Sequence, residues 1–164
     1  MSEPDEIESK IQERLQSVAR NAQGQNWPDP QWTREVKNAL ATLGRESDCD
    51  VWAASCDVEV RGGEWLFDLV WLKYCDHRLV GVPLVVESEW NPAGVYDDFE
   101  KLLVVRAEHR LLIFSAKTRT RAAERFVDLE QRVGQFEFTA SGDRYLFSCW
   151  TNDTAIFVFR VFVA

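Results

Sequence analysis

The chain has 164 residues, of which 46% are apolar, with seven Trp and ten Phe. This composition predicts one packed domain spanning 1–164 and excludes an intrinsically disordered chain. The formal net charge of −8 argues against a general nucleic-acid binder. No apolar run approaches the ~20 residues that a membrane span needs, and the charged N-terminus lacks the apolar core of a signal peptide. We therefore expect a cytoplasmic protein without a membrane partner.

Two amphipathic helices are predicted first. The first opens at Ser2-Glu3-Pro4 and runs to about Arg20, and a polar linker completes an N-terminal segment 1–26. The second begins at Asp29-Pro30, carries an apolar stripe and is expected to end at Gly44. The four cysteines show no C-x-x-C spacing and the chain has only two His, so the sequence predicts free thiols and no zinc site.

Strands dominate the middle of the chain. A first strand is predicted within 48–60, and two apolar runs at 65–74 and 79–87 are joined by a short turn and are hence antiparallel. A helix carrying Val95, Phe99 and Leu102 inward follows, and then a strand at 109–116. A helix from Lys117 to about 133 leads into a C-terminal part, 133–164, whose strands 144–151 and 154–163 form a hairpin. This order predicts an α/β (α+β) fold with a mixed central β-sheet flanked by helices.

Three carboxylates mark the central strands. Asp68 interrupts one apolar run, where a buried carboxylate must be paired, protonated or bound to a metal. Glu87 and Glu89 close the next run and, at i and i+2 of a strand, project to one face. If the runs pair, all three come close enough to share a divalent cation, without which they would repel one another. In the alternatives, Asp68 accepts backbone hydrogen bonds or pairs with a buried Arg, and the glutamates simply mark a strand leaving the core.

With these residues in place, the stretch 31–132 resembles the core of the PD-(D/E)xK nuclease superfamily, the restriction-endonuclease-like fold, with the order α-β-β-β-α-β. The resemblance rests on Asp68 in the second core strand and on Glu87-Ser88-Glu89 at the end of the third. It implies that Asp68 and Glu87 bind Mg²⁺ or Mn²⁺. The usual lysine of the motif is replaced by Glu89, as in E-x-E variants, or has moved to the following helix, where Lys101 stands.

Other residues carry weaker expectations. Lys101 has an i,i+4 salt bridge with Asp97 as its simpler interpretation, and Glu35 would add a water-mediated metal ligand if the resemblance extends to it. Trp90 is either a stacking surface or a packing lid.

The charge is unevenly distributed along the chain. Residues 1–100 hold twenty acidic and nine basic side chains, whereas 101–132 hold four acidic and eight basic ones. The basic residues at the start of the last helix are either a solvated face or DNA phosphate contacts on the same side as the acids: Lys117, Arg119, Arg121 and Arg125.

The sequence thus supports two functional hypotheses. The first is Mg²⁺-dependent phosphodiester hydrolysis of DNA, with Asp68 and Glu87 on the metal and Glu89 or Lys101 assisting the attacking water. The second is a catalytically inactive nuclease-fold module that binds a protein partner, as an interaction or immunity-type protein. The acidic net charge and the missing motif lysine favour the second hypothesis. Three carboxylates in an apolar sheet favour the first, because an inactive relic has no physical need to keep them.

Overall fold

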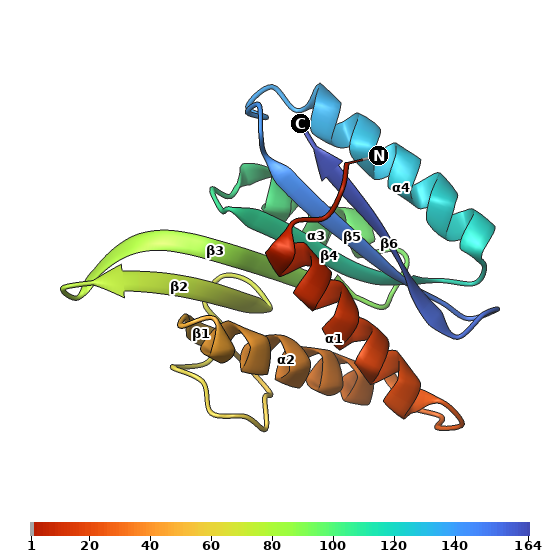
Figure 1. The fold of residues 1–164 in the computed structure, drawn as a ribbon. Helices are drawn as coiled ribbons and strands as arrows, with labels where there is room; N and C mark the ends of the chain where they lie inside the picture. The colour runs from red at the N-terminus through yellow and green to blue at the C-terminus, as the bar shows by residue number, and fades with distance from the viewer. Residues whose placement is uncertain (1) are drawn as a thin grey trace.

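The computed structural model describes residues 2–164 and contains a six-stranded mixed sheet with helices on both faces (Figure 1). The predicted α/β class with a mixed, helix-flanked sheet is confirmed. Strands β1 to β3 are antiparallel neighbours, β3, β4 and β5 run parallel, and β6 returns antiparallel to β5. The strand bounds are β1 (Asp50–Ala53), β2 (Leu69–Cys75), β3 (Arg78–Glu89), β4 (His109–Ala116), β5 (Arg144–Thr151) and β6 (Ile156–Val163).

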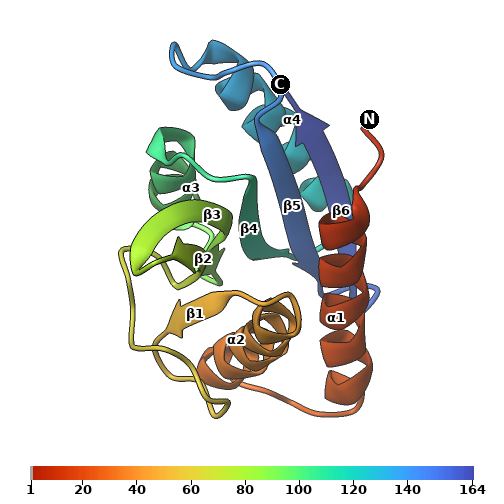
Figure 2. The ribbon, with the colours of Figure 1, turned by 60° about the vertical axis from the view of Figure 1, so that its left-hand side comes forward.

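The sheet separates two apolar cores. Helices α1 (Glu6–Ala22) and α2 (Asp29–Glu46) cover one face, and α3 (Val95–Val104) and α4 (Arg119–Gln135) cover the other (Figure 2). Alternate residues of a strand point to opposite faces, so Trp71 packs under α1 and α2 while its neighbour Val70 packs under α3 and α4. Among residues 2–164, no helix has the length and apolar content to cross a membrane, and all four cysteines are free.

Helix α1 starts later than the sequence suggests. It begins at Glu6 because Asp5 caps it: the Glu8 N–H donates to the Asp5 carboxylate and the Asp5 N–H donates to the Glu8 carboxylate, both at 2.9 Å. This reciprocal capping box satisfies two N–H groups that the first turn would leave unpaired. Residues 2–4 therefore precede the helix and do not form its first turn.

Gly44 does not end α2, which continues to Glu46. A Cβ at Gly44 would lie 2.5 Å from the indole nitrogen of Trp71 on the adjacent strand. That indole N–H donates to the Leu40 carbonyl at 3.2 Å. Glycine is required here for the close approach of α2 to the sheet, and not as a helix stop. The last helix, predicted over Lys117 to about residue 133, is α4 at Arg119–Gln135, and Gly134 lies inside it.

The first two strands are shorter than predicted. β1 covers only four residues, and an irregular loop occupies 54–68 before β2 begins at Leu69. Ser55 and Leu66 adopt positive φ values of 59° and 65°, which a regular strand cannot accommodate. Asp68 therefore lies in a bend directly before β2 and not within it. In the C-terminal hairpin, β5 has the predicted bounds, whereas β6 begins at Ile156.

Candidate active site

Asp68 lies at the end of the long loop, held against β3. One carboxylate oxygen accepts hydrogen bonds from the Ser88 backbone N–H at 2.8 Å and from the Ser88 hydroxyl at 3.0 Å. The other lies 3.5 Å from the ammonium nitrogen of Lys37 on α2, whose side chain is only 7% exposed. The alternative interpretation of Asp68, in which it accepts backbone hydrogen bonds, thus describes its contacts, although its cationic partner is Lys and not Arg.

Glu87 on β3 is the most deeply buried acid of the expected set, with 2% of its surface exposed. Asp68 directly precedes Leu69, the register partner of Val86, so the two acids lie on neighbouring segments. Their charged partners differ: Asp68 faces Lys37 on α2, whereas Glu87 faces Lys101 on α3, on the other face of the sheet. Burial raises the pKa of Glu87 to about 8, and repulsion from Asp68 and Asp98 adds to the increase. The Oε1 atom of Glu87 is buried and makes no hydrogen bond. The compensation for a charge at this oxygen is the ammonium of Lys101, 3.4 Å away, which lowers the pKa of Glu87 but does not offset its burial.

Lys101 on α3 is the cation nearest to Glu87. Its ammonium lies 3.4 Å from Glu87 Oε1 and donates to Asp98 Oδ1 at 2.7 Å. The hydrogen bond to Asp98, followed by the attraction of Glu87, raises the pKa of Lys101. The helical partner of Lys101 is therefore Asp98 at i−3, where the sequence suggested Asp97. Half of the Lys101 side chain is exposed, so it connects the buried Glu87 with the solvent.

Glu89 is turned away from this pair. Its Oε1 accepts the Asn91 backbone N–H at 2.7 Å, and its carboxylate fills the space beside Gly94, where a Cβ would collide with Oε2. The expected set of three metal-sharing carboxylates is therefore not assembled. Asp68 is held by Ser88, and Glu89 caps the loop that leads into α3. Within 2–164, the three-residue group whose ligand atoms lie within 4.8 Å of one another is a different one, Asp5, Glu8 and His109.

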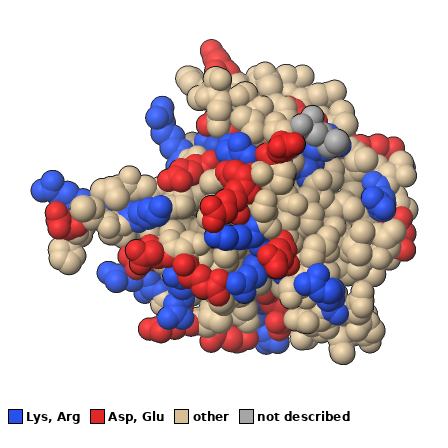
Figure 3. Space-filling view, in the orientation of Figure 1, with Lys and Arg blue, Asp and Glu red and all other residues tan. Residues whose placement is uncertain are grey.

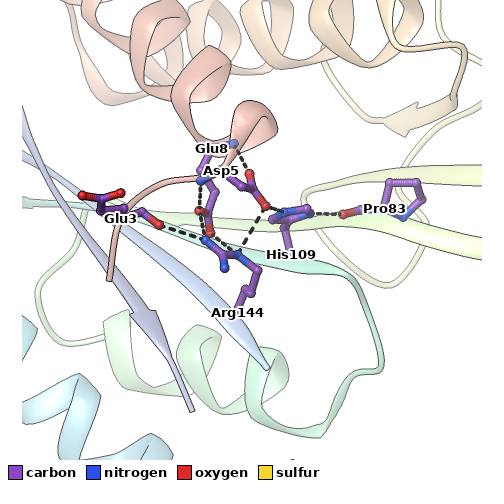
Figure 4. Close-up of polar contacts among 6 residues, drawn as sticks. All are labelled: Glu3, Asp5, Glu8, Pro83, His109 and Arg144. Atoms are coloured by element: carbon purple, nitrogen blue, oxygen red, sulfur yellow. Dashed lines mark hydrogen bonds and ion pairs between the residues drawn. The ribbon is translucent and has the colours of Figure 1, made fainter. Parts of the chain in front are cut away.

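That other group lies where α1 meets the first residues of β4 and β5, and it already contains a cation (Figure 4). Arg144 donates to both carboxylate oxygens of Glu8, at 3.1 and 2.5 Å, and lies 3.3 Å from Asp5. His109 Nε2 lies 2.7 Å from the Asp5 carboxylate, and its Nδ1 lies 3.0 Å from the Pro83 carbonyl. The guanidinium neutralises the acids from inside the group, so these residues form a structural tether for α1.

Three of the four predicted basic residues lie together. Lys117, Arg121 and Arg125 line a cavity of about 400 Å³ at the carboxyl end of β4, whereas Arg119 lies outside it and donates its backbone N–H to Asp153. β3 and β4 are parallel, so this cavity and Glu87 lie towards the same end of the sheet. Glu89 is the register partner of Phe114, which forms part of the cavity wall.

Two further expectations have plain outcomes. Trp90 is a packing residue: its indole N–H donates to the Thr33 hydroxyl at 2.9 Å, and its ring centroid lies 5.8 Å from that of Trp32. The Oε1 atom of Glu35 lies 3.9 Å from the Nε atom of its neighbour Arg34. Two residues further along α2, Lys37 is the side chain that reaches Asp68.

The sequence did not single out Lys37, Ser88 or Asp98. A signal existed for two of them. Lys37 precedes Leu40, Ala41 and Gly44 at the i+3, i+4 and i+7 spacing of a buried helix face, and Asp98 precedes Lys101 by one helical turn. No pattern signals Ser88, because its role depends on the path of the loop that delivers Asp68.

Comparisons with protein-family models, with curated proteins and with solved structures gave no match. We therefore propose a function from the chemistry of the residues at the site.

Proposed function

We propose that the chain is a divalent-cation-dependent phosphodiesterase that acts on DNA, with Asp68 and Glu87 as the cation ligands. The observation that carries this proposal is Glu87: a 2%-exposed carboxylate with an oxygen that makes no hydrogen bond, next to a second carboxylate. Such an arrangement is unfavourable by itself and becomes favourable when a cation is shared. Clusters of this kind are over-represented at functional sites.

The donor set fits a hard cation. Asp68 and Glu87 offer only carboxylate oxygens, which Mg²⁺ and Mn²⁺ prefer, and Mg²⁺ needs few protein ligands because it keeps several waters. When bound, the ion would neutralise the scissile phosphate and lower the pKa of a coordinated water. Lys101 is half exposed beside Glu87, and on this proposal it would orient that water or hold the phosphate. Glu89 is the weaker candidate for this role because its carboxylate is engaged by Asn91.

Cation binding is tested by melting the wild type with Mg²⁺, with Mn²⁺ and with chelator. Ligand at about 100 times its Kd should add about 2.7 kcal/mol to the free energy of unfolding. Glu87→Gln keeps the shape but removes the ligand charge, so it should lose this gain. Glu59→Gln, at an 84%-exposed side chain, is the matched control and should keep it. Plasmid nicking should likewise be lost in Glu87→Gln and kept in Glu59→Gln. An equal cation response in Glu87→Gln and the wild type would overturn the assignment of Glu87 as a cation ligand.

One set of observations supports the inactive interaction module as the second candidate. Both acids already face an ammonium group, Asp68 that of Lys37 at 3.5 Å and Glu87 that of Lys101 at 3.4 Å. On the face formed by α1 and α2, acidic and basic side chains interleave without a broad basic surface for DNA (Figure 3). A protein whose melting responds to neither Mg²⁺ nor Mn²⁺, and which leaves plasmid intact, would favour this module.

A further inference from the structure

The cavity at the carboxyl end of β4 has an excess of positive charge. Lys117 precedes α4, and Arg121 and Arg125 follow on its first two turns. Two acids share the lining, but Asp128 is already engaged: it accepts the Tyr96 O–H at 2.6 Å and pairs with Arg132 at 3.1 Å.

The three cations of the cavity differ in how they are paired. Within the described residues 2–164, neither Lys117 nor Arg125 takes part in an ion pair. Arg125 stacks over the Tyr96 ring at 4.5 Å, and its buried Nη1 makes no hydrogen bond. Arg121 pairs at 2.9 Å with Glu124, but both side chains are more than half exposed, and such surface pairs contribute little and exchange easily. The wall therefore offers cationic donors that an incoming anion can use.

The shape of the cavity limits which anion fits. Its volume of about 400 Å³ is in the range of small-molecule sites, and all three cations lie in its lining. Pro92 and Phe114 add apolar wall beside the charges. A duplex backbone requires an extended track of cations, whereas one phosphate with its sugar and base requires a pocket of mixed character.

We propose that this cavity binds one nucleotide of a single DNA strand, with Lys117, Arg121 and Arg125 facing its phosphate. The inference rests on the proposed phosphodiesterase function, because the cavity lies towards the same end of the parallel strands as Glu87 and would anchor the strand that reaches the acids. The phosphate is either a terminal monoester or an internal diester, which present the same oxygen chemistry to the three cations.

The test measures binding of short single-stranded DNA oligonucleotides by fluorescence anisotropy, in chelator and at several salt concentrations. Because chelator prevents cation-dependent hydrolysis, the result does not depend on whether the chain is a phosphodiesterase. In the double variant Lys117→Gln with Arg121→Gln, the Kd should increase about tenfold or more. The plot of log K against log salt should become less steep by about 0.7, because one phosphate neutralised on a single strand contributes about 0.7 to its slope.

The matched control is Lys10→Gln with Arg14→Gln, which removes the same charge from α1 on the opposite face of the sheet. Its Kd should change by less than about twofold, because long-range charge effects are screened beyond about 10 Å at moderate salt. An equal loss in both double variants, or no binding by the wild type, would overturn the proposal. Glu124→Gln should lower the Kd, because it frees Arg121 from its ion pair, and misfolding would not lower the Kd. Its control, Glu13→Gln on α1, should leave the Kd unchanged.

Oligonucleotides with and without a terminal phosphate separate the two sources of the ligand. Binding that requires the terminal phosphate and is abolished in the Lys117→Gln, Arg121→Gln variant assigns the cavity to a strand end. Equal binding of both oligonucleotides, abolished in the same variant, assigns it to an internal diester. Binding of either kind that the variant leaves intact contradicts the assignment of the cavity.

Discussion

Two clusters of ionisable side chains lie towards opposite ends of the parallel strands, and they differ in how completely they are paired. At the amino end, His109 and Arg144, the first residues of β4 and β5, meet the acids at the start of α1 (Figure 4). At the carboxyl end of β3, Asp68 and Glu87 meet the lysines of α2 and α3. Both clusters combine two carboxylates with basic groups, so residue types alone do not distinguish them.

The amino-end cluster is hydrogen-bonded throughout. Glu8, with no exposed surface, accepts from the Asp5 N–H and from Arg144. Both ring nitrogens of His109 lie within hydrogen-bonding distance of oxygens, those of the Asp5 carboxylate and the Pro83 carbonyl. Glu87 at the other end has a buried oxygen without a hydrogen bond. The complete cluster is explained by stability, whereas the incomplete one is the site at which we propose that a cation binds.

The largest effect is expected from opening the complete cluster. Arg144→Leu removes the guanidinium that neutralises the fully buried Glu8, and an uncompensated buried charge should lower the free energy of unfolding by about 3 kcal/mol or more. Urea denaturation at neutral pH measures this. Arg14→Leu, which breaks a surface pair with Glu46, should cost less than about 0.5 kcal/mol beyond the change in packing. Similar losses in the two variants would remove the distinction between the clusters.

The opposite sign is expected at the incomplete cluster. Folded Glu87 has a pKa of about 8, whereas the ordinary value is 4.5, so the folded state holds the proton more tightly. This stabilisation is fully present below about pH 4.5 and is lost as the pH rises to about 8. Glu87→Gln in chelator should therefore be more stable than the wild type by about 4 kcal/mol at pH 8 and nearly equal at pH 4. Melts at both pH values measure this, and a destabilised variant at pH 8 would show that Glu87 is well paired.

Asp68 should behave differently from Glu87 although the two are neighbours. Asp68→Asn leaves the buried ammonium of Lys37 without its carboxylate and should lower stability by about 1–2 kcal/mol in chelator. With a divalent cation the deficit should be larger, because the variant also loses the gain that the cation gives the wild type. The same change removes a charge that repels Glu87, so the pH dependence of unfolding should shift to a lower range. Chemical denaturation over a pH series reports both effects. An unchanged pH profile would show that Asp68 does not act on Glu87.

The smallest effect concerns the hydroxyl that holds Asp68. Ser88→Ala removes one hydrogen bond to the carboxylate and should cost about 1 kcal/mol. Ser148 on β5 is the matched control, because its buried hydroxyl makes no hydrogen bond, so Ser148→Ala should be neutral or stabilising. If Ser148→Ala costs as much as Ser88→Ala, the loss reflects packing and not the hydrogen bond.

The parts of this structure that the sequence predicts are those set by local pattern. Apolar periodicity and turn residues located the helices and the bounds of β4 and β5, and the spacing of the apolar runs was enough to predict the class of fold. The prediction that Gly44 ends α2 is wrong because glycine both ends helices and permits close packing. Only the position of Trp71 shows which of these two roles Gly44 has. The start of β2 was misplaced because an apolar run does not reveal the positive φ of Leu66.

The site shows the same limit. Antiparallel pairing of the two apolar runs predicts that Asp68 and Glu87 lie on neighbouring segments, but not which helix each carboxylate faces. The rotation of Glu89 towards Asn91 is a loop contact two residues away, which strand parity does not encode. The approach of Lys37 to Asp68 joins residues 31 positions apart through the packing of α2 on the sheet. Predicting which side chains of different elements contact each other requires the tertiary structure, whereas predicting which face of an element is buried does not.

The tether of α1 also constrains the order in which the chain acquires its structure. The helix docks through contacts that span most of the sequence: Asp5 to His109, Glu8 to Arg144, and Gln16 to the Phe157 carbonyl at 2.7 Å. Contacts of such high sequence separation form late, because long loops must close first. At about 5–20 residues per second, the ribosome releases α1 many seconds before β5 and β6. We therefore expect α1, although it is synthesised before the sheet, to be the last of these elements to gain protection. Hydrogen exchange on a fragment ending before β5 would then show unprotected α1 amides.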